Sequence, residues 1–167
     1  MNDQIQLYCG QGIGKSSAAI GKAVRYACKG KTVFIVRFLK GKASLEYDFL
    51  QRLEPEIKLF CFDKFDAPYS ELSDEEKEEE ASHIKNGVGY ARKVAATGEC
   101  DVLVLDEALE LLTLGIITPE EMQEIITSAG QDVKIIITGS GRHEEIWPYV
   151  DRVTEVSTLK EEESEAW

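Results

Sequence analysis

Basic residues are scarce in this sequence. Its 167 residues contain 19 Lys and Arg against 31 Asp and Glu, which gives a formal net charge of −12. Nucleic acids and anionic lipid surfaces attract basic proteins, so this balance argues against a partner of either kind. The basic residues that are present cluster, because positions 11–42 hold eight of them and no acidic residue. That segment suits a small anionic ligand even though the whole chain is acidic.

Long apolar runs and paired cysteines are missing as well. No run approaches the ~20 apolar residues that span a bilayer, and the first ten residues are too polar for a secretory signal peptide. The four cysteines are spread along the chain without a Cys-x-x-Cys pair, so neither a disulfide framework nor a thiolate metal site is expected. We therefore expect a protein of the reducing cytoplasm without a membrane-spanning segment.

Short apolar segments alternate with helical patterns along the chain. Most of the apolar segments are continuous, which indicates strands buried on both faces, as in a parallel sheet covered by helices. This alternation predicts an α/β fold with a mostly parallel sheet of about six strands flanked by helices. Strands are predicted at 5–9, 32–38, 57–62, 102–105, 133–138 and 152–156, and helices at 16–29, 43–53, 74–96 and from Thr118 onward.

The chain contains no internal repeat and no linker rich in Pro, Gly or Ser. We therefore predict a single domain over residues 1–159. The remaining residues, 160–167, are strongly acidic, and this composition predicts a disordered tail.

A glycine-rich turn joins the first predicted strand to the first predicted helix. Its glycines let the backbone curl and point N–H groups toward a phosphate, while Lys15 supplies a cation and Ser16 a hydroxyl for Mg²⁺. The first glycine comes one residue later than in the standard P-loop pattern. We predict a P-loop nucleotide-binding domain of RecA-like architecture, whose phosphate-binding segment is Gly10, Gln11, Gly12, Ile13, Gly14, Lys15, Ser16 and Ser17.

Two carboxylates, Asp106 and Glu107, end the fourth predicted strand. In an open α/β fold ligands bind at the carboxyl edge of the sheet, so both are expected to face the phosphates. Carboxylate and hydroxyl oxygens suit Mg²⁺, and the predicted metal ligands are Ser16, Glu107 and Asp106. Arg37, at the end of the second predicted strand, and Lys40 just after it lie beside this carboxyl edge if the sheet is parallel. Arg37 and Arg142, which follows the fifth predicted strand, are expected to reach the nucleotide there. Arg142 fits a solvated loop position as well.

Four aromatic residues cluster at the end of the third predicted strand and in the segment that follows it: Phe60, Phe62, Phe65 and Tyr69. Rings in such a segment either cover a flat apolar ligand or close the core. The sequence leaves both interpretations open.

The segment 8–19, Tyr-Cys-Gly-Gln-Gly-Ile-Gly-Lys-Ser-Ser-Ala-Ala, resembles the short P-loop of the ATP:corrinoid adenosyltransferases, which has the same glycine spacing. The resemblance extends over about residues 4–158. Three further segments fall in the family's order and at similar separations, namely 36–41, 101–107 and 135–143.

This resemblance implies a reaction in which Co(I) of a corrinoid, such as cob(I)yrinic acid a,c-diamide or cob(I)alamin, attacks the 5′ carbon of ATP and expels triphosphate. ATP and the corrinoid are then substrates, and Mg²⁺ is the cofactor. Ser16 and Glu107 would hold Mg²⁺ with Asp106 alongside. Phe65 and Tyr69 would face the corrin ring. The resemblance also implies a homodimer and an electron-donor flavoprotein as a partner.

The chain departs from the family pattern in four places, one of which is the segment 66–69, Asp-Ala-Pro-Tyr, where the cobalamin-facing loop of the family has a Phe and Trp pattern. Ile13 and Ser140 stand where a lysine and an arginine are usual, and the family's C-terminal segment is missing, so the resemblance is to a divergent member. Two alternatives therefore stay open. One is a P-loop NTPase or small-molecule kinase, for which Glu107 is the candidate base. The other is a non-catalytic nucleotide-binding module.

Overall fold

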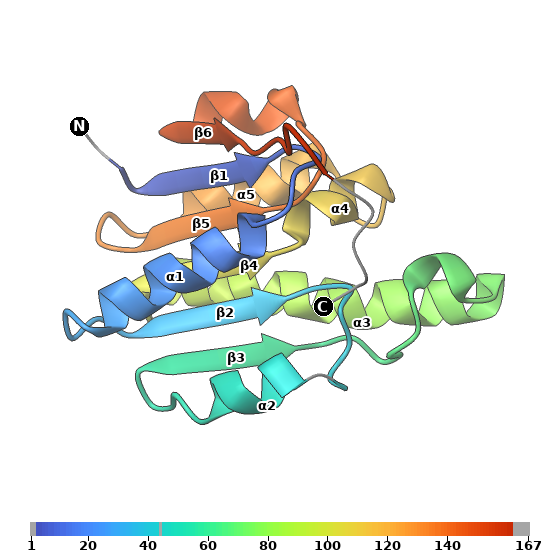
Figure 1. The fold of residues 1–167 in the computed structure, drawn as a ribbon, viewed down its shortest axis with the longest axis horizontal. Coiled ribbons are helices and arrows are strands. Elements are labelled where there is room, and N and C mark those ends of the chain that lie inside the picture. The colour runs from blue at the N-terminus through green and yellow to red at the C-terminus, as the bar shows by residue number, and fades with distance from the viewer. Residues whose placement is uncertain (1–2, 44, 162–167) are drawn as a thin grey trace.

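All six strands of the sheet run parallel. The computed structural model describes residues 3–43 and 45–161, and within them the strand order is β3-β2-β4-β5-β1-β6 (Figure 1). The predicted α/β fold with a parallel sheet is confirmed. Strand β5 lies between β1 and β4, as in a P-loop NTPase architecture. The strands are β1 (Ile5–Cys9), β2 (Val33–Arg37), β3 (Ile57–Cys61), β4 (Val102–Asp106), β5 (Lys134–Thr138) and β6 (Arg152–Glu155).

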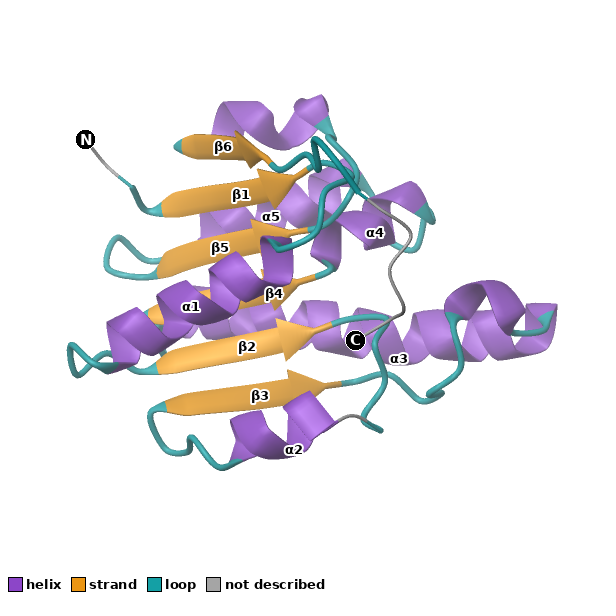
Figure 2. Cartoon of the chain, in the orientation of Figure 1, coloured by secondary structure: helices purple, strands orange, loops and turns teal. Residues whose placement is uncertain are grey.

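Helices cover both faces of the sheet (Figure 2). One face carries α1 and α2, and the opposite face carries α3 and α5, which also contact each other. The sequence did not predict α4 or the short 3-10 helices η1 and η2, because segments of three to six residues show no helical period. The helices are α1 (Lys15–Ala27), α2 (Leu45–Gln51), η1 (Tyr69–Glu71), α3 (Asp74–Thr97), α4 (Ala108–Thr113), α5 (Pro119–Ser128) and η2 (Glu144–Tyr149).

The central strands β2 and β4 are buried along their whole length. Ile35 belongs to an apolar cluster that includes residues of α1, whereas its neighbour Phe34 belongs to a cluster that includes residues of α3 and α5. Two charged residues, Arg37 and Asp106, end these strands and are also buried. Buried charges are tolerated when they are paired. The carboxyl edge of the sheet is therefore the place where charged side chains lie within the core.

Capping boxes begin the two helices α3 and α5. In α3 the Ser73 hydroxyl accepts a hydrogen bond from the Glu76 amide (3.2 Å), and the Glu76 carboxylate accepts one from the Ser73 amide (2.8 Å). Thr118 and Glu121 form the same arrangement in α5, with Pro119 at the first helical position. Hydrogen bonds from Ser73 lower the pKa of Glu76. The acidic run at this position is therefore a helix start, since acids favour the positive end of the helix dipole.

Gly87 of α3 lies where the helix contacts the sheet. A Cβ at this position would be 2.8 Å from the Phe62 ring and 3.2 Å from Phe38, whereas a Cβ at Gly89 would meet no described atom within 4 Å. We expect Gly87→Ala to lower the free energy of unfolding by about 1–3 kcal/mol through overpacking. Gly89→Ala should raise it by up to about 1 kcal/mol through helix propensity. Urea denaturation of both variants measures this, and equal shifts would contradict the close contact.

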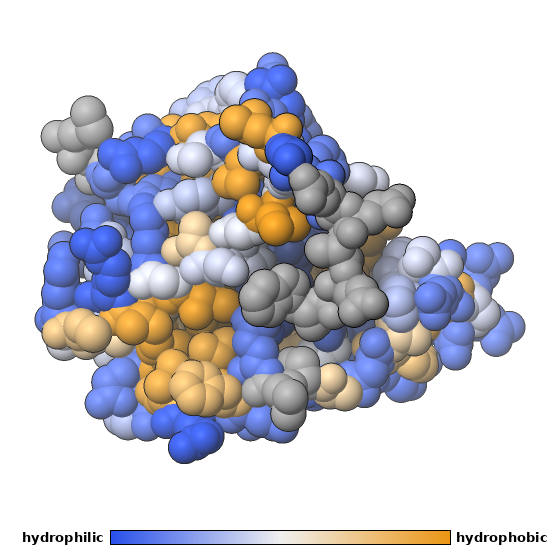
Figure 3. Space-filling view, in the orientation of Figure 1, coloured by the Kyte–Doolittle hydropathy of each residue, from blue (hydrophilic) through white to orange (hydrophobic). Residues whose placement is uncertain are grey.

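Apolar side chains also reach the surface between α1 and α2, where Figure 3 shows an apolar area; Val24 and Phe49 are its exposed members. Among the described residues, no helix is both long enough and apolar enough to span a membrane. Lys160 and Glu161 are exposed, and the rest of the predicted tail, 162–167, lies outside the described residues.

Candidate active site

The carboxyl ends of the parallel strands meet at one edge, and the loop of residues 10–14 joins β1 to α1 there (Figure 1). Gly10 and Gly14 have φ angles of +100° and +103°, a region that side chains rarely adopt. A Cβ at Gly10 would stand 2.4 Å from the Val156 carbonyl oxygen, and the Gly12 amide donates a 2.9 Å hydrogen bond to that same oxygen. The loop therefore needs glycine for its turn and for its close contact with the segment after β6.

Helix α1 begins directly behind this loop, with Gly14 as its N-cap and no side chain capping it. The first amides of a helix have no acceptor within the helix, and its dipole favours an anion at this end. Lys15 is the first helical residue, and its ammonium group donates a 2.5 Å hydrogen bond to the Gly12 carbonyl. Only 8% of Lys15 is exposed, and this cation folds back over the loop.

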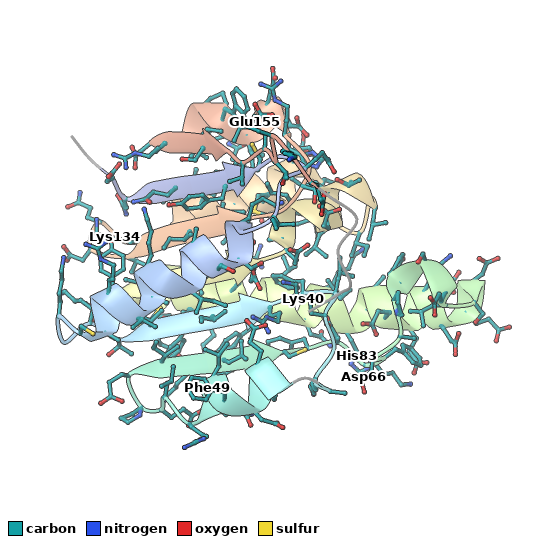
Figure 4. The ribbon with its side chains drawn as sticks, in the orientation of Figure 1. Lys40, Phe49, Asp66, His83, Lys134 and Glu155 are labelled. Atoms are coloured by element: carbon teal, nitrogen blue, oxygen red, sulfur yellow. The ribbon has the colours of Figure 1, made fainter. Side chains whose placement is uncertain are left out.

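A hollow lies in front of the loop, lined by residues 11–17 together with Lys40 and Glu107. It brings residues 11–17 of the predicted phosphate-binding segment together with Glu107, so that two predicted metal ligands, Ser16 and Glu107, lie at one place. Figure 4 shows Lys40 beyond the carboxyl end of β2, beside the start of α1. The sequence predicted only that Lys40 lies near this edge. Within the described chain, neither Arg37 nor Arg142 lines the hollow.

Asp106 is buried at the floor of the site, 1% exposed. Its carboxylate accepts hydrogen bonds from the Ser16 hydroxyl (2.7 Å) and the Thr138 hydroxyl (2.9 Å), and its other oxygen is 3.1 Å from Arg37 Nε. Burial raises the pKa of Asp106, but Lys40, Ser16, Arg37 and Thr138 together hold it below its usual value. The carboxylate is therefore ionised at neutral pH, and its four partners fix its position.

Glu107 follows in the left-handed backbone region, with φ at 62°. Its amide donates a 3.0 Å hydrogen bond to the Thr138 hydroxyl, and its carboxylate lies 3.5 Å from Ser16 Oγ. The side chain is 22% exposed, unlike that of Asp106. The two adjacent carboxylates thus have different surroundings: Asp106 is enclosed, and Glu107 faces the hollow.

The two predicted nucleotide-binding arginines lie elsewhere. Arg37 is 1% exposed and pairs with Asp106 and with Glu46 of α2, the latter at 2.9 Å. Arg142 is exposed, lies over the Trp147 ring and pairs with Glu155 at 3.7 Å. Arg37 therefore offsets the negative charge of the buried Asp106 carboxylate. Direct contact of either arginine with a nucleotide stays a prediction.

The four aromatic residues divide into two pairs. Phe60 and Phe62 pack on the core, with ring centroids 4.9 Å and 5.5 Å from that of Tyr90. Phe65 and Tyr69 are half-buried and lie under the ammonium groups of Lys64 and Lys77. All four rings are half-buried and Tyr69 packs against the core as well, so burial does not decide which of them contacts a ligand.

Two buried carboxylates, those of Asp63 and Glu80, accept hydrogen bonds from the backbone of the segments next to the site. Asp63 is 4% exposed and accepts hydrogen bonds from the amides of residues 39, 40 and 41. Glu80 of α3 accepts bonds from the amides of residues 64 and 65. Burial raises the pKa of Glu80. Neither role has a sequence signal, because Asp63 is a single carboxylate with no diagnostic spacing and Glu80 is one of several acids in the run 74–80.

The parallel sheet and the glycine loop before α1 have the architecture of a P-loop NTPase fold. The family of the ATP:corrinoid adenosyltransferases BtuR/CobO/CobP matches residues 1–166, and the chain belongs to this family. It is 26% identical over 157 residues to the corrinoid adenosyltransferase of Escherichia coli K12. The matched region covers 93% of this chain and 77% of that protein. The corrinoid adenosyltransferase CobA of Salmonella typhimurium is similar to the same extent. An uncharacterized protein of Nostoc sp. is 30% identical over 95% of this chain and 45% of its own length.

Proposed function

We propose that this chain transfers the 5′-deoxyadenosyl group of ATP to the cobalt of a corrinoid and releases triphosphate. The bond between cobalt and the 5′ carbon forms with the electron pair of Co(I), and the bond from that carbon to the triphosphate oxygen breaks. The observation that carries the proposal is the meeting of residues 11–17 and Glu107 at one hollow, with the buried Asp106 accepting a hydrogen bond from the Ser16 hydroxyl, in a chain of this family.

The phosphate side of the site suits a leaving triphosphate. Negative charge grows on the triphosphate as the bond breaks, so groups already oriented toward it lower the barrier. The amides that begin α1 supply one such group, and the Lys15 ammonium group supplies another once it leaves the Gly12 carbonyl. Because cobalt is itself the nucleophile, the protein needs no activated side chain, and its task is positioning and charge stabilisation.

The oxygen groups beside the hollow suit Mg²⁺, a hard cation that prefers one or two carboxylates plus phosphate oxygens. The Ser16 hydroxyl and the Glu107 carboxylate, 3.5 Å apart, are the two groups that would hold it. Asp106 already has four partners, so we assign it to orienting Ser16. When bound, the metal would neutralise part of the triphosphate charge.

The corrinoid side of the site is the segment 62–72, which runs beside α3 beyond the edge of the sheet (Figure 1). Cobalt is easier to reduce when its lower axial ligand has left, and apolar rings pressed against the corrin face can exclude that ligand. Phe65 and Tyr69 are half-buried rings of this segment, each next to a lysine ammonium group. Burying each of them would contribute about 1.5–3 kcal/mol to the displacement.

We expect Phe65→Ala and Tyr69→Ala to lower turnover about tenfold when cob(II)alamin must be reduced on the enzyme. Turnover with chemically reduced cob(I)alamin should change little, because the ligand has already left. Adenosylcobalamin formation is followed by its absorbance, and Phe49→Ala, an exposed ring of α2, is the matched control. Equal losses with both substrates would assign the rings to general binding or folding.

The test of the proposed function is anaerobic incubation of the protein with ATP, Mg²⁺ and reduced cobalamin. Adenosylcobalamin and triphosphate in equal amounts are the expected products. ADP and phosphate instead would indicate an NTPase or kinase. Tight ATP binding without turnover would indicate a nucleotide-binding module.

The homodimer and the electron-donor flavoprotein that the family resemblance implies belong to the same proposal. Sedimentation equilibrium tests the dimer. Reduction of cob(II)alamin on the enzyme by a reduced flavodoxin, in place of a chemical reductant, tests the second partner.

A further inference from the structure

The ammonium group of Lys40 lies among the side chains considered for the metal. Its Nζ atom is 3.0 Å from Ser16 Oγ, 3.6 Å from Asp106 Oδ2 and 3.7 Å from Glu107 Oε1. Lys40 reaches them from the segment after β2, whereas its three partners belong to α1 and to the end of β4 (Figure 4). One protein cation therefore contacts all three oxygen groups at once.

The backbone of Lys40 is fixed by the fold. The Asp63 carboxylate accepts hydrogen bonds from the amides of Leu39 (3.2 Å), Lys40 (3.0 Å) and Gly41 (2.9 Å). Leu39 adopts a φ of 61°, which is unfavourable for a bulky residue and persists only where surrounding contacts impose it. The position of the lysine is therefore set by Asp63 and does not depend on a freely moving loop.

We propose that Lys40 is a positioning residue that occupies the metal site until the nucleotide arrives. The inference rests on the proposed function, since it takes Ser16 and Glu107 as the metal ligands. An ammonium group and a divalent cation repel each other, so they compete for the same oxygen groups. Binding of a metal alone must therefore first displace the lysine.

A bound triphosphate changes this competition. Its oxygens offer the ammonium group new anionic partners beside the loop, and the Lys40 side chain is 36% exposed, so it has room to move. The metal then gains both the vacated protein oxygens and the phosphate oxygens. Metal and nucleotide consequently bind together, and the nucleotide-free protein holds a metal ion only weakly.

The direct test is Mn²⁺ binding to the nucleotide-free protein, measured by electron paramagnetic resonance with Mn²⁺ in place of Mg²⁺. We expect Lys40→Gln to bind Mn²⁺ about tenfold more tightly than the unmodified chain, the change that one charge-assisted hydrogen bond is worth. Lys40→Arg keeps the cation and should bind as weakly as the unmodified chain. Lys42→Gln removes the same charge from an exposed position two residues away and is the matched control.

Thermal denaturation gives a second readout that does not involve catalysis. Without nucleotide, Mg²⁺ should raise the Tm of Lys40→Gln and leave that of the unmodified chain and of Lys42→Gln nearly unchanged. Equal Mn²⁺ affinities of Lys40→Gln and the unmodified chain would overturn the inference, as would an equal gain in Lys42→Gln. Tighter Mn²⁺ binding by Lys40→Gln together with no adenosyl transfer by the unmodified chain would uphold the inference and refute the proposed function.

Discussion

Lys15→Ala is expected to lower the affinity for ATP tenfold or more while the fold stays intact. Charge-assisted hydrogen bonds to phosphate are worth about 1.5–3 kcal/mol each, and Lys15 is the cation at the junction of loop and helix. Among the described residues its ammonium group bonds to the Gly12 carbonyl, and Lys15 belongs to neither apolar cluster of the core, so the variant loses contacts at the loop only. Isothermal titration calorimetry with ATP measures the effect.

Lys22→Ala is the matched control for Lys15. It removes the same charge from the same helix, at a position that contacts Gln6 and the Tyr8 ring and does not line the hollow. ATP affinity should be unchanged in this variant. If Lys15→Ala binds ATP as tightly as Lys22→Ala does, and both have native circular dichroism spectra, the P-loop assignment is wrong.

Glu107→Gln should raise the Mg²⁺ concentration for half-maximal turnover about tenfold, because an amide is a much weaker ligand for a hard cation than a carboxylate. ATP binding without metal should stay the same or become slightly tighter, since a negative charge near the triphosphate is removed. Mg²⁺ titrations of turnover and calorimetry in the presence of a chelator separate the two effects.

Glu124→Gln on α5, whose carboxylate pairs with Arg92 at the surface, is the control for loss of an acidic charge. Superimposable Mg²⁺ titration curves for Glu107→Gln and the control would remove Glu107 from the metal site. Ser16 and Asp106 would then be the remaining candidate ligands. They form a poor ligand set, because Asp106 already has four contacts.

Local signals in the sequence were sufficient for most of the fold. The capping boxes of α3 and α5 depend on residues three positions apart, and the continuous apolar strands identified a sheet covered on both sides. The glycine loop is local as well, since its turn needs small residues within one short segment. These features follow from interactions between near neighbours, so a single sequence displays them.

The parts of the site that sequence reasoning missed depend on residues that are distant along the chain. Arg37 was expected to reach the nucleotide, and its pairing with Asp106 follows from the register of β2 against β4, in which the two residues are partners. Thr138 joins the same network from the end of β5. No spacing rule relates these positions, because strand order and register decide which side chains meet.

By itself the sequence determined the α/β class, the starts of α3 and α5 and the glycine loop between β1 and α1. Each of these rests on the preferences of a segment and its immediate neighbours, which hold whatever the rest of the chain does. Only the tertiary structure decided that Asp106 is enclosed while Glu107 faces the hollow, and that Asp63 fixes the backbone of Lys40 beside Ser16. Whether a charged side chain binds a ligand or another side chain depends on which neighbours the packed strands bring within hydrogen-bonding distance.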